Sequence, residues 1–142
     1  MATTQAFSDS MENNVLDVFF RNQARTHGDD GTKKIFIALC TATITEGMTG
    51  ATIPELPNAN GYTARQQITF NSASGGVLTN STTATFTCSG TAWNPVISIA
   101  LCDTSTIGAG NHMMYDNTIT SVTLNPGDTL AFNAGQVTVT LT

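Results

Sequence analysis

The sequence contains little charge, and basic residues are almost absent from most of it. Only 11% of the residues are charged, and the stretch from Gln66 to Thr142 has no Lys or Arg and only three acids, Asp103, Asp116 and Asp128. Acid-base and nucleophilic catalysis need titratable groups gathered in one pocket. This half of the chain has almost none to gather. The sequence therefore predicts a non-enzymatic protein that fits against other surfaces.

Three further absences narrow the class of protein. The formal net charge of −5 comes without any basic cluster, which argues against sequence-independent binding of nucleic acid. No apolar run approaches the ~20 residues of a membrane helix. The N-terminus lacks a basic region followed by an apolar stretch, as a secretory signal would have. We therefore expect a protein that folds in a reducing cytoplasm and contacts neither nucleic acid nor a membrane.

Metal-ligating and catalytic patterns are missing as well. The two histidines, His27 and His112, have no Cys or His at metal-ligand spacing, so we predict neither a metal site nor a cofactor. No Gly-x-Ser-x-Gly motif occurs. A glycosidase would need two of the three aspartates above as catalytic carboxylates. All three fall in predicted turns or at strand ends, where an aspartate is ordinarily solvated or hydrogen-bonded to the backbone. The cysteines, Cys40, Cys88 and Cys102, sit in strand-like segments and are predicted to be small buried hydrophobes.

What the sequence does contain is a series of short alternating segments. Polar Thr and Ser alternate with Val, Leu and Phe, as in Val137–Leu141, which is typical of strands with one buried face. Nine such segments predict strands: 34–42, 63–70, 77–79, 83–88, 96–102, 112–116, 121–124, 129–132 and 136–141. Many short strands joined by Asn- and Gly-containing turns predict a mainly β, antiparallel, jelly-roll-type sandwich over residues 29–142. The hexapeptides Ile35–Cys40 and Ile97–Cys102 differ only at their second position, which suits two central strands under the same packing demand.

The first 28 residues are predicted to form an N-terminal arm and one amphipathic helix. Residues 1–7 are small and polar, and we expect no structure of their own there. Ser8 or Ser10 can cap the helix, and Asp9 and Glu12 place negative charge in its first turn. Its apolar stripe is too broad to face water, so it should pack on the sheet or on a neighbouring subunit. Residues 43–61, rich in Gly, Pro and Asn, predict a long exposed loop.

Five residues are candidates for interfaces: Phe19, Phe20, Tyr62, Arg65 and Trp93. The two phenylalanines could form an apolar contact surface on the helix. Arg65 is the only basic residue after Lys34, so we predict an anchor with a carboxylate or carbonyl partner, the alternative being a strand residue that extends to solvent. Trp93 either stacks on a ligand such as a sugar or closes one end of the sandwich.

The order of these features resembles a family of small phage structural proteins, often labelled tail fibre or virion proteins. In that family a short polar segment and a helix come first, followed by a hydrophobic strand with an Ala-Leu-Cys/Tyr-Thr ending and a Gly-Tyr-x-Arg-Gln element. A Trp segment then precedes the second central strand, and the family closes with an Asn/Ala-Gly-Asp turn and a Phe-x-Ala-Gly-x-Val-Thr-Leu hairpin. These correspond here to Phe7–Asn22, Ile37–Thr41, Gly61–Gln66, Trp93 with Ile97–Asp103, and Gly127–Asp128 with Phe132–Val139. This chain departs from the pattern by one inserted residue, Thr63, which bears on local strand register.

The resemblance implies a role in the virion without naming an active site. Similar proteins look like jelly-roll trimers clamped outside tailed-phage capsids as cement, and the tail-fibre label is also common. From it we expect a homotrimeric capsid cement or decoration protein that folds in the host cytoplasm. It would bind the major capsid protein on the capsid exterior and bridge capsomers. The alternative is a tail-fibre or receptor-binding module in which Trp93, Tyr62 and the turn aspartates grip a cell-surface glycan.

Overall fold

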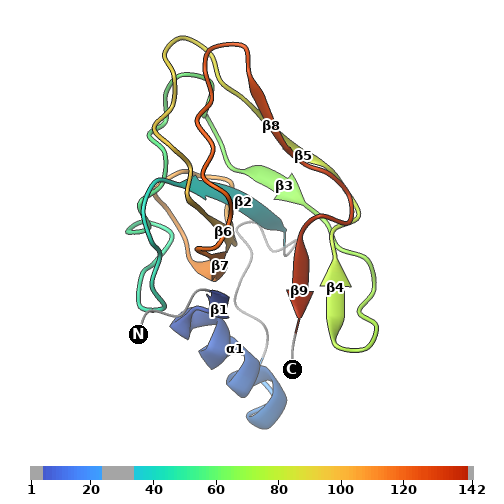
Figure 1. The fold of residues 1–142 in the computed structure, drawn as a ribbon. Coiled ribbons are helices and arrows are strands. Elements are labelled where there is room, and N and C mark those ends of the chain that lie inside the picture. Colours follow the sequence, from blue (N-terminus) through green and yellow to red (C-terminus); the bar gives the residue numbers. More distant parts are fainter. Residues whose placement is uncertain (1–4, 24–33, 141–142) are drawn as a thin grey trace.

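The computed structural model describes residues 5–23 and 34–140, and it is mainly β with a single helix in that part of the chain (Figure 1). The elements are β1 (Gln5–Phe7), α1 (Asp9–Phe20), β2 (Ile35–Cys40), β3 (Gln66–Ile68), β4 (Val77–Thr79), β5 (Ala84–Thr87), β6 (Ser98–Cys102), β7 (His112–Asp116), β8 (Thr129–Phe132) and β9 (Thr138–Thr140). Every strand pairing is antiparallel. The predicted fold class, a mainly β antiparallel sandwich with one N-terminal helix, is confirmed.

One layer of the sandwich is a five-stranded sheet in the order β1-β7-β6-β2-β3. The two near-identical hexapeptides supply its central neighbours, β2 and β6, which pair with Ala38 opposite Ala100. All of β6 and all but the first residue of β2 are buried. A strand covered on both faces needs apolar side chains at successive positions, which accounts for the likeness of the two segments.

The other layer is a long two-stranded ribbon. β5 pairs with β8 and β4 with β9, and the chain runs from β4 into β5 and from β8 into β9, so the two pairs are halves of one antiparallel ribbon (Figure 1). The corner between the halves is fixed by Asn80, which is fully buried. Its side chain donates to the Asn133 carbonyl at 2.9 Å and accepts from the Val137 backbone N–H at 2.8 Å. The amide thus replaces ladder hydrogen bonds where the ribbon bends.

Hydrophobic residues pack on both faces of the sheet. Between sheet and ribbon lies the larger cluster, which includes Leu39, Tyr62, Phe86 and Trp93. On the other face a second cluster contains Ile44 and Ile53 from the segment 43–61, against Ala38, Cys40, Ala100, Cys102 and Tyr115. The prediction that this segment is an exposed loop is therefore wrong in part. Its isolated isoleucines, set between turn residues, cover sheet surface that would otherwise meet water.

Two local predictions differ from the structure. Residues Gln5–Phe7 of the expected unstructured arm form β1, which pairs with β7 from Gln5 opposite Asp116 to Phe7 opposite Met114. This pairing satisfies backbone groups of β7 that an edge strand would leave open. The expected strand 121–124 is reduced to one bridge, in which Val122 and Val96 exchange backbone hydrogen bonds of 2.8 and 3.0 Å. The predicted boundary between residues 28 and 29 lies outside the described residues.

The helix is fixed at its start and projects at its end. Ser8, one of the two predicted caps, caps it by accepting from the Met11 N–H, and its own backbone N–H donates to the Met113 carbonyl at 2.8 Å. The Ser8 hydroxyl also donates to the His112 carbonyl. No residue of α1 is buried, and Leu16, Phe19 and Phe20 are 54%, 78% and 81% exposed.

Candidate interaction surface

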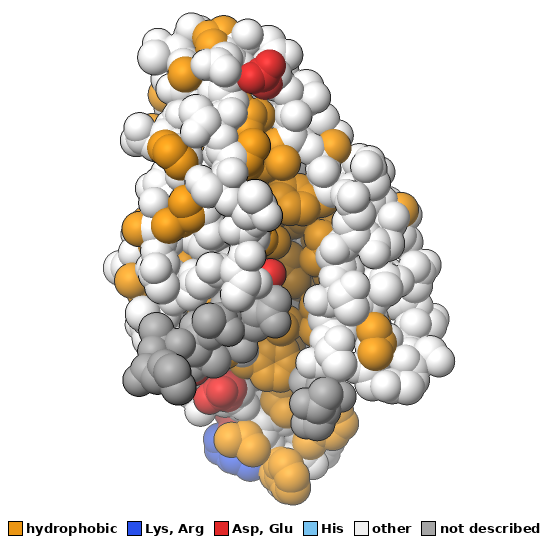
Figure 2. All heavy atoms as spheres, viewed as in Figure 1, with side chains coloured by type: hydrophobic (Ala, Val, Ile, Leu, Met, Phe, Trp, Pro, Cys, Tyr) orange, Lys and Arg blue, Asp and Glu red, His pale blue; other side chains and the backbone are white. Residues whose placement is uncertain are grey.

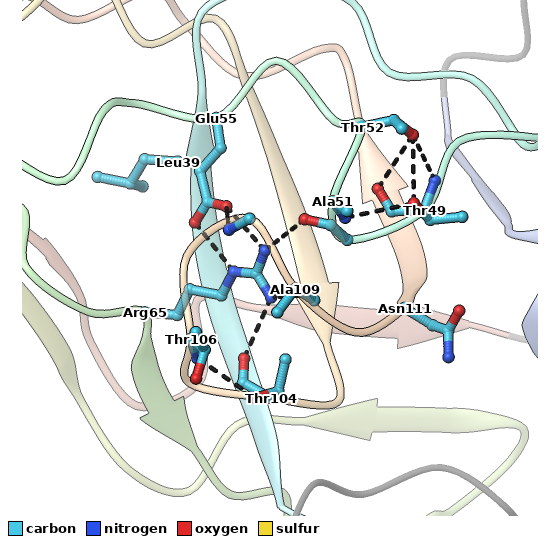
Figure 3. Close-up of polar contacts among 12 residues, drawn as sticks. Leu39, Thr49, Ala51, Thr52, Glu55, Arg65, Thr104, Thr106, Ala109 and Asn111 are labelled. Carbon is cyan, nitrogen blue, oxygen red and sulfur yellow. Dashed lines mark hydrogen bonds and ion pairs between the residues drawn. The ribbon is translucent and has the colours of Figure 1, made fainter.

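Arg65 lies inside the protein and joins three segments of the chain (Figure 3). Its guanidinium donates to the Glu55 carboxylate at 2.9 and 2.7 Å, a two-pronged ion pair between side chains that are 0% and 5% exposed. It also donates to the carbonyls of Gly50, Thr104 and Ala109 at 2.7, 3.2 and 2.9 Å. The predicted carboxylate and carbonyl partners are confirmed. The five donors of an arginine suit such a crossing point of loops.

Glu55 ties this ion pair to the hydrophobic core. It accepts from the Tyr62 hydroxyl and from the Gly108 N–H, and the same Tyr62 oxygen accepts from the Leu39 N–H at 3.2 Å. Burial and the adjacent Glu55 carboxylate raise the pKa of Tyr62 far above its usual range. Although burial alone would lower the pKa of Arg65, its hydrogen bonds to Glu55 help raise it above the ordinary value. Because the pKa values of Tyr62 and Arg65 are raised, both side chains keep their protons near neutral pH, which suits a structural role.

Trp93 and Tyr62 are core residues. They are 5% and 1% exposed and meet edge to face with ring centroids 5.9 Å apart, and Tyr62 also stacks on Phe86. The Trp93 indole N–H donates to the Asn60 carbonyl at 2.8 Å. With both rings held against protein atoms, neither offers a free face to a sugar. The placement favours the alternative in which Trp93 closes the sandwich.

The three aspartates of the C-terminal half each bond a backbone N–H of a nearby turn. Asp103 accepts from Asn111, Asp116 from Thr118 and Asp128 from Asn125, at 2.8, 2.7 and 2.9 Å. Within residues 5–23 and 34–140, no group of three His, Cys, Asp or Glu side chains could hold a metal ion, and His27 lies outside that part. The three cysteines are free and buried, as predicted, and burial raises the pKa of Cys102 to about 12.

Acidification is expected to destabilise the protein through His112. This side chain is fully buried, and burial lowers its pKa below the ordinary 6.5, with Asp9 acting in the opposite direction. Below that pH the unfolded chain binds a proton that the folded chain resists, so stability is complete above about pH 6.5 and falls as the pH drops. The slope is at most about 1.4 kcal/mol per pH unit.

Urea unfolding between pH 7.5 and 5.5 measures this effect. His112→Gln, which keeps a polar side chain and loses the titration, is expected to flatten the slope whatever its effect on stability at pH 7.5. All carboxylates are shared by the two proteins and cancel in the comparison. An unchanged slope in His112→Gln would contradict the assignment.

An open groove with many apolar lining residues lies between the sheet and the ribbon. It has two adjoining compartments of about 560 and 260 Å³, and Phe7, Leu101, Met114 and Val139 line both. Among the described residues that line them, Asp116 is the one carboxylate. In Figure 2 the groove is the band of hydrophobic side chains that runs down the molecule towards the helix between two polar walls. Neither its existence nor its lining was predicted.

The five candidate residues separate into two groups. Tyr62, Arg65 and Trp93 lie in the interior, where they hold the fold. Phe19 and Phe20 lie on the surface of α1, and with Leu16 they are the large hydrophobic side chains exposed in the described part of the chain. An interface role for the five stays a prediction, and only the two phenylalanines can meet a partner without the core opening.

The buried polar groups Arg65, Glu55 and Tyr62 hold the protein's own loops and core together, and the open groove contains many apolar side chains. The family described as Podophage GP4 fiber I protein gp80 matches residues 6–140. The chain belongs to this family, and it is a structural protein of the phage virion. No curated protein matches the chain. In residues 5–23 and 34–140 no helix is long and apolar enough to cross a membrane.

Proposed function

We propose that the chain is a non-enzymatic building block of a virion fibre. The observation that carries this proposal is the match of residues 6–140 to a family described as a fibre protein. The interior supports the non-enzymatic part of the proposal, because Arg65 and Tyr62 both donate to Glu55 and these polar side chains hold the fold. With Tyr62 and Trp93 buried, the fibre role rests on protein-protein contact. The glycan-binding alternative depended on these two aromatic rings, and both are buried.

Capsid cement is the second candidate, and the surface favours it. The stretch from Gln66 to Thr142 carries no basic residue, and its β5 strand turns Thr85 and Thr87 outward while Ala84 and Phe86 are buried. A neutral, hydroxyl-rich face suits many small contacts with the major capsid protein, repeated around the shell exterior.

Copy number in purified virions decides between the two. Quantitative mass spectrometry should find a fibre protein at a small fraction of the abundance of the major capsid protein, and immunogold label should lie on fibres. Abundance close to that of the major capsid protein, with label over the whole shell, would overturn the fibre and support cement.

A further inference from the structure

The strand β9 has a backbone edge that opens onto the groove. β4 and β9 form a sheet of only two strands, so β9 has no strand on the side away from β4. The consecutive residues 136–140 all line the larger compartment. Because successive side chains of a strand point to opposite faces, such an unbroken run lines one space when the backbone edge itself faces it.

The register of β9 shows which backbone groups lie on that open edge. Val77 lies opposite Thr140, and Thr79 lies opposite Thr138. Val77 exchanges backbone hydrogen bonds of 3.1 and 3.0 Å with Ser74, on the side of β4 away from β9. Opposite residues in an antiparallel pair either bond to each other or both point outward, and the two kinds alternate along the strand. Thr138 and Thr140 therefore direct their N–H and C=O groups away from β4, where no backbone hydrogen bond within residues 5–23 and 34–140 uses them.

This edge carries little of the protection that free strand edges usually have. Native proteins blunt such edges with Lys, Pro, inward-pointing charges, bulges or short strands. β9 is short, but residues 136–140 are Gln, Val, Thr, Val and Thr, without a charge or a proline, and the pairing with β4 has no register shift. Open backbone groups beside an apolar surface are a template for the addition of another strand.

The groove restricts the chemistry of a strand that could be added. Apolar side chains, among them Phe7, Leu101 and Val139, line both compartments. The one lining carboxylate, Asp116, already accepts from the N–H and the hydroxyl of Thr118. A charged side chain placed here would lose its hydration without gaining a partner. An added strand must therefore turn uncharged, apolar side chains towards the groove at every second position.

We propose that β9 pairs along its open edge with an extended, uncharged segment of a different virion protein. Backbone hydrogen bonds at Thr138 and Thr140 fix the register of the segment, and its alternate side chains fill the groove. In the described part of the chain a second copy could offer only strands that are already paired in its own sheets, so it has no spare segment to give. The inference rests on the place of the chain in the virion and applies equally to a fibre and to capsid cement. Copy number tests those two roles, whereas the pairing is tested at single amides, so the two can fail separately.

Hydrogen exchange measured on purified virions and on the isolated chain tests the pairing directly. The amides of Thr138 and Thr140 should exchange about tenfold more slowly, or slower still, in virions. The Val139 amide is the internal control, because it lies opposite Leu78 and faces β4, so it should be protected in both samples. Equal exchange of Thr138 and Thr140 in virions and in the isolated chain would overturn the proposal.

Thr138→Pro and Thr138→Val form a matched pair of variants. Proline removes the outward N–H and is tolerated on an edge strand at such a position, whereas valine keeps the N–H and suits a strand. Quantitative mass spectrometry of virions should find the proline variant at about a tenth or less of the wild-type abundance, relative to the major capsid protein, and the valine variant unchanged. Wild-type abundance of a folded proline variant would contradict the pairing. If circular dichroism shows that the proline variant is unfolded, the exchange measurement decides.

The partner segment is identified with the photo-cross-linker p-benzoylphenylalanine placed at Gln136, an exposed position in the groove lining. Irradiated virions should yield a cross-link to an uncharged segment of a different virion protein in which polar and apolar residues alternate. Cross-links only to another copy of this chain, or to a charged segment, would show that the occupant is not the one proposed.

Discussion

Replacing Arg65 by alanine is expected to lower the free energy of unfolding by about 3–5 kcal/mol. The variant leaves the buried Glu55 carboxylate without its counter-ion, and it removes the donor from the carbonyls of Gly50, Thr104 and Ala109. Since small domains are stable by only about 5–15 kcal/mol, this is a large part of the total. Urea or thermal unfolding followed by circular dichroism measures it.

Arg21→Ala is the matched control for this prediction. Arg21 also pairs with a carboxylate, Asp17 at 2.9 Å, but their side chains are 68% and 43% exposed. Solvent screening makes an exposed pair at this helical spacing worth only about 0.3–0.5 kcal/mol. Equal losses in the two variants would show that Arg65 is not the anchor that its contacts indicate.

Arg65→Lys separates charge from geometry. A lysine keeps the positive charge but has no planar fork, so it cannot reach the carboxylate and three carbonyls at once. We expect Arg65→Lys to be less stable than the wild type and more stable than Arg65→Ala. A lysine variant as stable as the wild type would mean that charge alone matters at this position.

The sequence predicted the elements whose signals are local. Chemistry within one helical turn indicated Ser8 or Ser10 as the cap of α1, with Asp9 and Glu12 in the first turn, and Ser8 is the cap. The repeated hexapeptides predicted two central strands under the same packing demand. The strand expected at 121–124 has the right residues. Its single bridge at Val122 shows that a strand also needs a partner of matching length, which no local pattern encodes.

The sequence predicted a residue of the candidate site only where a residue type was scarce in the chain. Arg65 stood out because the chain around it has no other basic residue, and its need for a carboxylate followed from charge. That the carboxylate is Glu55, and that the loop containing Thr104 and Ala109 closes over it, depends on how distant segments meet. The groove forms because of the path that the ribbon takes past Asn80. The alternation of polar and apolar residues within single strands does not encode that path.

Replacing Trp93 by alanine is expected to cost about 3–5 kcal/mol, the usual range for removing a large aromatic side chain from a core. The change removes the ring that meets Tyr62 edge to face and leaves the Asn60 carbonyl without the indole donor. Trp93→Phe keeps most of the volume and loses that hydrogen bond, so a smaller loss of about 1–3 kcal/mol should follow.

Trp93 also separates a structural role from recognition of a glycan. A tryptophan that stacks on a sugar is exposed, so its removal would abolish glycan binding and leave thermal stability nearly unchanged. With Trp93 5% exposed, we expect the opposite order: Trp93→Ala should lower the melting temperature markedly, and any binding on a glycan array should decline only as the folded fraction does. A variant that melts like the wild type but loses a glycan signal would restore Trp93 as a contact residue and favour the receptor-binding form of the fibre.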